Sequence, residues 1–107
     1  MAKIDFTYLE VLCEDDDDFK KEYLETFESN YTSLTEKMQK ELSGGDFVSL
    51  GKTAHQLKPT AKMIQLPCAE DLEHLQHHPQ DATKDKIAAI RKECEEAFKA
   101  LKKWAES

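Results

Sequence analysis

Hydrophobic side chains recur every three or four positions along most of this chain, which is the period of an amphipathic α-helix. The longest stripe, over residues 19–42, comprises Phe19, Tyr23, Phe27, Tyr31, Leu34, Met38 and Leu42. The acidic residues 14–18 precede it, and Ser43, Gly44 and Gly45 follow it. We expect an aspartate to cap the start of this helix and a glycine to end it, because both satisfy backbone groups left unpaired at helix ends. The acidic run lacks the alternating ligands of a calcium loop, so no metal is expected there.

Stripes of the same period predict further helices at residues 6–13, 47–64, 69–75 and about 83–104. Thr7 and Asp46 stand where N-caps are expected, and Pro67 suits a first helical position. The 47–64 stripe would direct its apolar members into the core: Phe47, Leu50, Ala54, Leu57, Ala61 and Ile64. Pro59 lies inside this pattern and conflicts with a regular helix.

The connections between these segments are short and polar, and no strand pattern, repeat or linker interrupts them. Short connections between long helices imply antiparallel neighbours. The sequence therefore predicts an all-α fold, an antiparallel up-down four-helix bundle with a short extra N-terminal helix, forming one domain over residues 1–107.

Composition narrows the class of protein. The 107 residues carry a formal net charge of −7, which makes the chain a poor candidate for binding nucleic acid. No apolar run approaches the ~20 residues of a membrane helix and no signal region opens the chain, so we expect a cytoplasmic monomer. Cys13, Cys68 and Cys94 form no C-x-x-C pair and are expected to be buried, reduced side chains.

His55 is the one histidine in the 47–64 segment, and it lies outside the apolar stripe. At about 100° per residue, a helical wheel centres that stripe roughly 130° from His55. The residues that share the face of His55 are Val48, Gly51, Lys52, Lys58, Pro59 and Lys62. This face therefore combines an imidazole with three lysines in a chain that is otherwise acidic.

Each of these residue types has a use in phosphoryl transfer. Neutral imidazole is a nitrogen nucleophile near pH 7, and lysines supply positive charge for phosphoryl oxygens. Gly51 in mid-helix costs roughly 1 kcal/mol against alanine, which suggests that something must approach this face closely. An incidental histidine on a solvated helix face fits the same pattern, so the residues alone leave both interpretations open.

Other chemistry has weaker support. No P-loop, dinucleotide fingerprint, G-x-S-x-G elbow or H-E-x-x-H motif is present, which argues against a self-contained enzyme site. His74 and His78 have the i,i+4 spacing of a metal pair, but no carboxylate or cysteine is clearly arranged with them. We therefore expect no metal site and interpret these histidines as a solvated helix end.

The segment Ala54-His55-Gln56-Leu57-Lys58-Pro59-Thr60-Ala61, running on to Ile64 and Leu66, resembles the signature of histidine-containing phosphotransfer (HPt) domains. Phe19, Phe27 and the pair Gly45-Asp46 also stand where that family usually has such residues. The resemblance covers nearly the whole chain, including its length and the order of its predicted helices.

The resemblance implies a function and a set of roles. His55 would accept a phosphoryl group on Nε2, and Lys58 would be the cation beside it. The surrounding face would dock receiver domains of a hybrid sensor histidine kinase, a response regulator or both. Its residues are Val48, Gly51, Lys52, Pro59 and Lys62. The receiver would bring the aspartate and Mg²⁺, so this chain would need no cofactor and have no kinase or phosphatase activity of its own.

Two positions depart from the family pattern, and one further contact stays open. The family often has glycine at the positions of Pro59 and Gln65. Pro59 lacks the N–H that would pair with the carbonyl of His55, so we expect a slight kink or a water there. Gln65 puts in doubt the tight helix approach that glycine would permit. A side chain of the neighbouring helix can contact the imidazole in this family, and Gln76 or His77 could do so here.

A protein of another class would fit the same face. A phosphorylation-independent helical adaptor would bind its signalling partner there without transferring a phosphoryl group. Degenerate HPt domains of this kind usually lack the histidine, and this chain retains His55.

Overall fold

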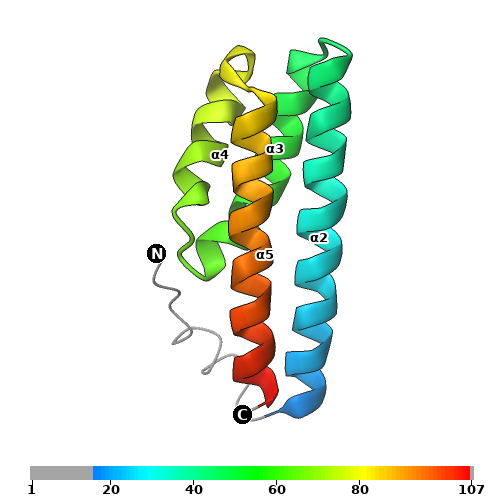
Figure 1. The fold of residues 1–107 in the computed structure, drawn as a ribbon, viewed down its shortest axis with the longest axis vertical. Coiled ribbons are helices and arrows are strands. Elements are labelled where there is room, and N and C mark those ends of the chain that lie inside the picture. The colour runs from blue at the N-terminus through cyan, green and yellow to red at the C-terminus, as the bar shows by residue number, and fades with distance from the viewer. Residues whose placement is uncertain (1–15, 107) are drawn as a thin grey trace.

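The computed structural model describes residues 16–106 and contains four α-helices and one short 3₁₀ helix in that range. These are α2 (Asp17–Ser43), α3 (Phe47–Met63), α4 (Cys68–His77), η1 (Pro79–Asp81) and α5 (Lys84–Glu106). The helices alternate in direction along the bundle, and no strand occurs among the described residues (Figure 1). The all-α, up-down prediction is therefore confirmed, whereas the short helix expected over residues 6–13 lies outside the described part.

Backbone pairing at its two ends explains the bounds of α2. The Asp16 carboxylate accepts a hydrogen bond from the Phe19 N–H at 3.1 Å, which is an N-cap. At the other end Gly45 adopts a φ of 69°, a left-handed conformation that glycine reaches without steric cost. The Asp46 N–H then bonds to the Glu41 carbonyl at 2.9 Å, which closes the last turn.

The connection from α3 to α4 uses the same type of helix end without a glycine. Gln65 has a φ of 55°, and its N–H bonds to the Lys62 carbonyl at 3.1 Å. The Leu66 N–H bonds to the Ala61 carbonyl at 2.9 Å, and the Leu66 side chain is buried. Position 65 therefore favours glycine because its backbone is left-handed, whereas close helix approach was the reason expected from the sequence.

Helix α3 continues through Pro59 without a break and ends at Met63. The proline cannot donate to the His55 carbonyl, so one bond of the helical ladder is missing directly beneath the candidate site. Thr53 fixes α3 against α2, because its buried hydroxyl donates to a Glu41 carboxylate oxygen at 2.7 Å.

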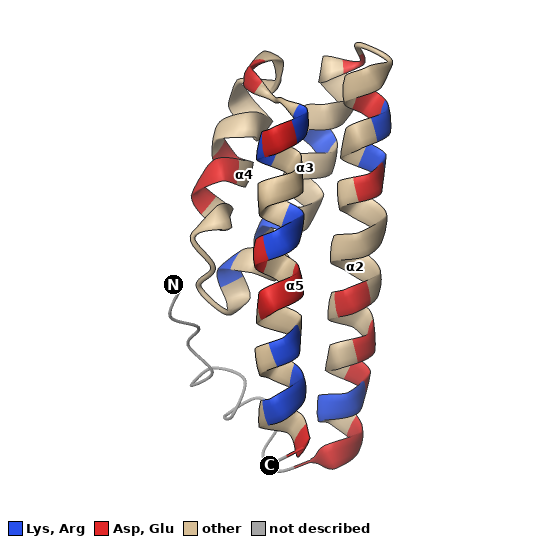
Figure 2. Cartoon of the chain, in the orientation of Figure 1, with Lys and Arg blue, Asp and Glu red and all other residues tan. Residues whose placement is uncertain are grey.

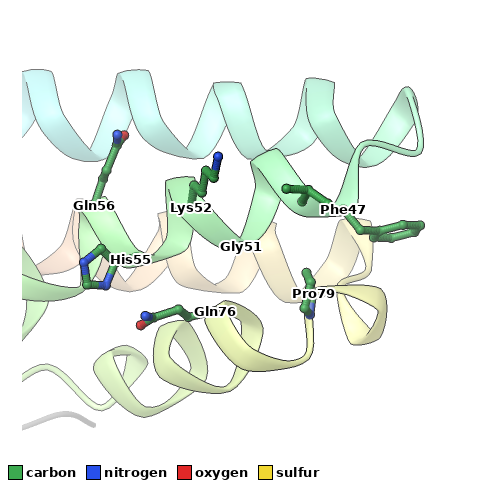
Figure 3. Close-up of a pocket in the computed structure, with 8 residues that line it drawn as sticks. Phe47, Gly51, Lys52, His55, Gln56, Gln76 and Pro79 are labelled. Atoms are coloured by element: carbon green, nitrogen blue, oxygen red, sulfur yellow. The ribbon is translucent and has the colours of Figure 1, made fainter.

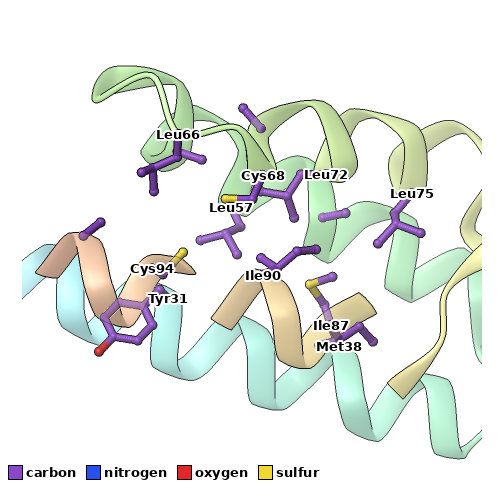
Figure 4. Packing of buried hydrophobic residues seen from close by; sticks show 14 of the residues in the cluster. Tyr31, Met38, Leu57, Leu66, Cys68, Leu72, Leu75, Ile87, Ile90 and Cys94 are labelled. Atoms are coloured by element: carbon purple, nitrogen blue, oxygen red, sulfur yellow. The ribbon is translucent and has the colours of Figure 1, made fainter. Parts of the chain in front are cut away.

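A single apolar core runs along the interior of the four helices (Figure 4). Its largest fully buried hydrophobic members are Phe27, Met38, Leu50, Leu57, Ile64, Leu72, Leu75, Ile87, Ile90 and Leu101. Cys68 and Cys94 are buried in it as free thiols. Contact with the Cys94 thiol, together with burial, raises the pKa of Cys68, so this thiol stays protonated.

Helices α2 and α5 are longer than α3 and α4 and extend beyond them at one end of the molecule (Figure 1). At that end the Lys20 ammonium lies 5.1 Å from the centre of the Trp104 ring, a cation–π contact between the two helices. No helix of residues 16–106 is long and apolar enough to cross a membrane.

Candidate functional site

His55 lies on the outer side of α3, where its side chain is exposed to solvent. Its neighbours Ala54 and Leu57 point into the core and are completely buried. The helical wheel therefore separated the two sides of α3 correctly around the histidine. An exposed neutral imidazole can act as a nucleophile toward a group brought by another molecule.

A cavity of about 560 Å³ opens directly beside His55, between α3 and the end of α4 with η1 (Figure 3). Its lining residues are Phe47, Val48, Gly51, Lys52, His55, Gln56, Gln76 and Pro79. Phe47, Val48 and Pro79 contribute apolar surface to this cavity. Val48 is 71% exposed, which leaves an apolar side chain available for contact with a partner.

Gly51 is buried where α4 crosses α3, although the sequence placed it on the open face. A Cβ at this position would lie 3.1 Å from the Gln76 carbonyl oxygen and 3.7 Å from that of Leu75. The close approach that the mid-helix glycine indicated is therefore made by α4 of the same chain. Gly51 was expected to belong to the surface that a partner approaches, and in the described structure it instead packs against the backbone of α4.

Lys58 is held by the neighbouring helix. Its ammonium donates a hydrogen bond to the Gln76 side-chain oxygen at 3.0 Å, and both side chains are half-buried. The Gln76 side chain reaches from α4 toward the ring of His55 (Figure 3). His77, the other residue considered for this position, is exposed and does not line the cavity.

The remaining lysines and Pro59 occupy different places on α3. Lys52 lines the cavity, whereas Pro59 and Lys62 are exposed beyond it. No aspartate or glutamate occurs between Asp46 and Glu70, so the lysines are the charged groups of α3 (Figure 2). The candidate site is thus locally positive in a chain with a net charge of −7.

Three of the residues that line the cavity were not found from the sequence: Phe47, Gln56 and Pro79. Gln76 had been named as one of two residues that could contact the imidazole. Phe47 was predicted to be a core residue, which is wrong, because it is 37% exposed at the first turn of α3. Gln56 is adjacent to His55 and could have been found on the same wheel. Pro79 belongs to another segment, and no local pattern indicates which helix face it approaches.

His74 and His78 lie together at the end of α4, and His74 is hydrogen-bonded to Asp81. His74 Nε2 lies 2.8 Å from an Asp81 carboxylate oxygen, and the rings of His74 and His78 are 5.0 Å apart. The hydrogen bond from His74 lowers the pKa of Asp81. Among residues 16–106 no group of three potential ligands is arranged to hold a metal ion.

The family model for the Hpt domain matches residues 22–101 of the chain, a span that includes the whole of α3 and α4. The chain belongs to the Hpt domain family. Comparisons with curated proteins and with solved structures gave no match. Hpt domains carry phosphoryl groups in phosphorelays and interact there with receiver domains. In this Hpt domain the matched span contains His55, the cavity and the Lys58–Gln76 pair.

Proposed function

We propose that this Hpt domain accepts a phosphoryl group on His55 from a receiver-domain aspartate and passes it to another receiver. The observation that supports this most is the exposed imidazole of His55 at the edge of a cavity, together with the Lys58 ammonium bonded to Gln76, which lines the same cavity. The receivers would belong to a hybrid sensor histidine kinase, a response regulator or both. The common core of α2 to α5 supports a single domain acting as one unit.

The transfer is a substitution at phosphorus. The lone pair of His55 Nε2 forms the N–P bond while the P–O bond to the aspartate breaks, and the electron pair stays on the leaving carboxylate. Lys58 offsets negative charge on the phosphoryl oxygens. The receiver supplies Mg²⁺, and the chain itself supplies the nucleophile, the helical platform and the positive charge.

The apolar lining of the cavity would favour docking of a receiver domain beside His55. Phe47, Val48 and Pro79 offer apolar surface on one side of His55, and burial of such surface contributes about 25 cal/mol per Å². Contact there would bring a partner over the imidazole and exclude water from the reacting atoms. The lysines favour a partner whose approaching site is acidic.

The test is transfer of labelled phosphate from a phosphorylated receiver. The wild type should acquire label that is lost in acid and kept in base, whereas His55→Gln should acquire none. His77→Gln is the matched control, since His77 is an exposed histidine on α4 outside the cavity. Equal labelling of wild type and His55→Gln would rule out His55 as the acceptor.

The exposed apolar part of the cavity also suits an adaptor that binds without transfer. In that case receivers would bind the wild type and His55→Gln equally, and neither would be labelled. Val48→Asp should weaken binding under both functions, so labelling is the measurement that separates them.

A further inference from the structure

Gln76 contacts α3 at two points, one on each side of His55. Its backbone carbonyl lies against Gly51, where an added Cβ would be only 3.1 Å away. Its side-chain oxygen accepts the hydrogen bond from Lys58 at 3.0 Å. Gly51, His55 and Lys58 are spaced i, i+4 and i+7, so they follow one face of the helix. Gln76 therefore spans the face that presents the imidazole.

The Lys58 side chain has a long flexible stem, and fixing such a chain costs rotamer entropy. A bond to a residue that α4 already holds in place reduces that cost before any phosphoryl group arrives. The ammonium has three N–H donors, and the bond to Gln76 uses one of them. Two donors remain for phosphoryl oxygens on His55.

The acceptor in this bond is neutral. Elsewhere α4 presents the carboxylates of Glu70, Asp71 and Glu73, but the residue that reaches Lys58 is an amide. A carboxylate at this position would pair with the ammonium and cancel its charge, and it would repel the incoming phosphoryl group. An amide oxygen holds the ammonium and leaves its positive charge available.

We propose that Gln76 is a positioning residue, whose carboxamide holds the Lys58 ammonium beside His55 for the phosphoryl group without neutralising it. Gly51 supports this arrangement, because the missing side chain lets the backbone of α4 approach α3 at residue 76. The inference rests on the proposed phosphotransfer function and assigns a further residue to it.

The experiment uses phosphoramidate, a small chemical donor, so that no cognate receiver is needed. The rate of His55 phosphorylation is followed by ³¹P NMR over a range of donor concentrations. Gln76→Glu, which keeps the shape and changes the charge, should slow the reaction about tenfold or more at saturating donor, since one added charge acts at hydrogen-bond distance. Gln80→Glu, the same change at an exposed residue outside the cavity, should react like the wild type.

A second pair of variants isolates the contact with Lys58. Gln76→Ala should slow the reaction several-fold in the wild type and should have no further effect in Lys58→Met, because the group it positions is already gone. The ¹³C relaxation of the Lys58 Cε methylene should show increased motion in Gln76→Ala. Circular dichroism and thermal unfolding check that each variant retains the bundle.

The possible results are distinguishable. A Gln76→Glu protein that reacts at the wild-type rate would overturn the inference, as would an equal effect of Gln76→Ala with and without Lys58. Unchanged motion of the Lys58 methylene in Gln76→Ala would also overturn it, independently of any transfer. A wild type that acquires no phosphohistidine from a phosphorylated receiver would instead contradict the proposed function on which the inference rests.

Discussion

At Gly51 the sequence correctly predicted a close approach to the helix but not the group that makes it. The helical wheel places Ala54 and Leu57 in the core and His55 on the outer face, because that division depends only on local periodicity, but it places the buried Gly51 on the outer face as well. The energetic cost of a glycine in mid-helix indicates a close approach at this position. The approaching group is the backbone of α4, which is 24 residues away at Leu75 (75 − 51) and is located only by the tertiary packing.

Gly51→Leu should destabilise the protein by about 1–3 kcal/mol, the usual cost of forcing a side chain into a filled contact. The added carbons would meet the carbonyls of Leu75 and Gln76, which cannot move without shifting α4. Val48→Leu on the exposed surface of the same helix is the control and should change stability by less than about 0.5 kcal/mol. Urea unfolding measures both, and equal midpoints would contradict the packing role of Gly51.

At the scale of elements, the sequence predicted most helices because their signals are local. Asp16 and Asp46 both cap helices through their side chains, and the apolar stripes indicated the interior correctly for residues such as Leu57. Phe47 deviates because it lies in the first turn, where no neighbouring element covers it. Gln65 could not be assigned from its identity, since glutamine rarely adopts a positive φ.

Gln65→Gly should raise the free energy of unfolding by about 0.5–1 kcal/mol. The left-handed conformation at this position costs a non-glycine residue roughly 1–2 kcal/mol, and part of the gain is offset by the greater freedom of glycine in the unfolded chain. Gln56→Gly, in the middle of α3, should lower the same free energy by about 1 kcal/mol. The two identical substitutions therefore have opposite signs, and thermal unfolding would contradict the helix-end assignment if both were destabilising.

At the scale of the molecule, α4 is the shortest α-helix described and connects to α5 through a few specific contacts. Its first turn has no side-chain cap of its own, and the Glu93 carboxylate of α5 accepts the hydrogen bond of the Cys68 N–H at 2.6 Å. At its other end the His74–Asp81 pair connects α4 to η1, which places Pro79 at the cavity. The site therefore depends on both ends of α4.

Glu93→Ala should destabilise the protein by about 1–2 kcal/mol, because it leaves a backbone N–H at the start of α4 without its charged acceptor. Glu95→Ala is a matched control on the same helix. Its carboxylate makes an exposed i,i+4 pair with Arg91, which contributes only about 0.3–0.5 kcal/mol. Amide hydrogen exchange should show faster exchange at the start of α4 in Glu93→Ala alone, and protection equal to wild type would contradict the capping role.

The His74–Asp81 pair predicts a specific dependence on pH. The pKa of Asp81 lies below its ordinary value of 3.8, so the folded state favours the charged carboxylate. Its contribution to stability is present above that value and is lost as the pH falls through the lowered pKa. Asp81→Asn should therefore be less stable than the wild type at pH 5, and the difference should shrink toward pH 3. The pair is half-exposed, so the effect is small. A difference that grows on acidification would contradict this sign.

The run of α3 without carboxylates has a consequence for encounters with other proteins. A chain with a net charge of −7 repels an acidic partner from most directions, and the lysines of α3 reverse that repulsion over one narrow stripe. An acidic partner that approaches any other surface is thus repelled electrostatically before contact forms. The charge distribution therefore favours encounters in which an acidic partner faces α3. Added salt should weaken both the repulsion by the acidic surface and the attraction by the lysines.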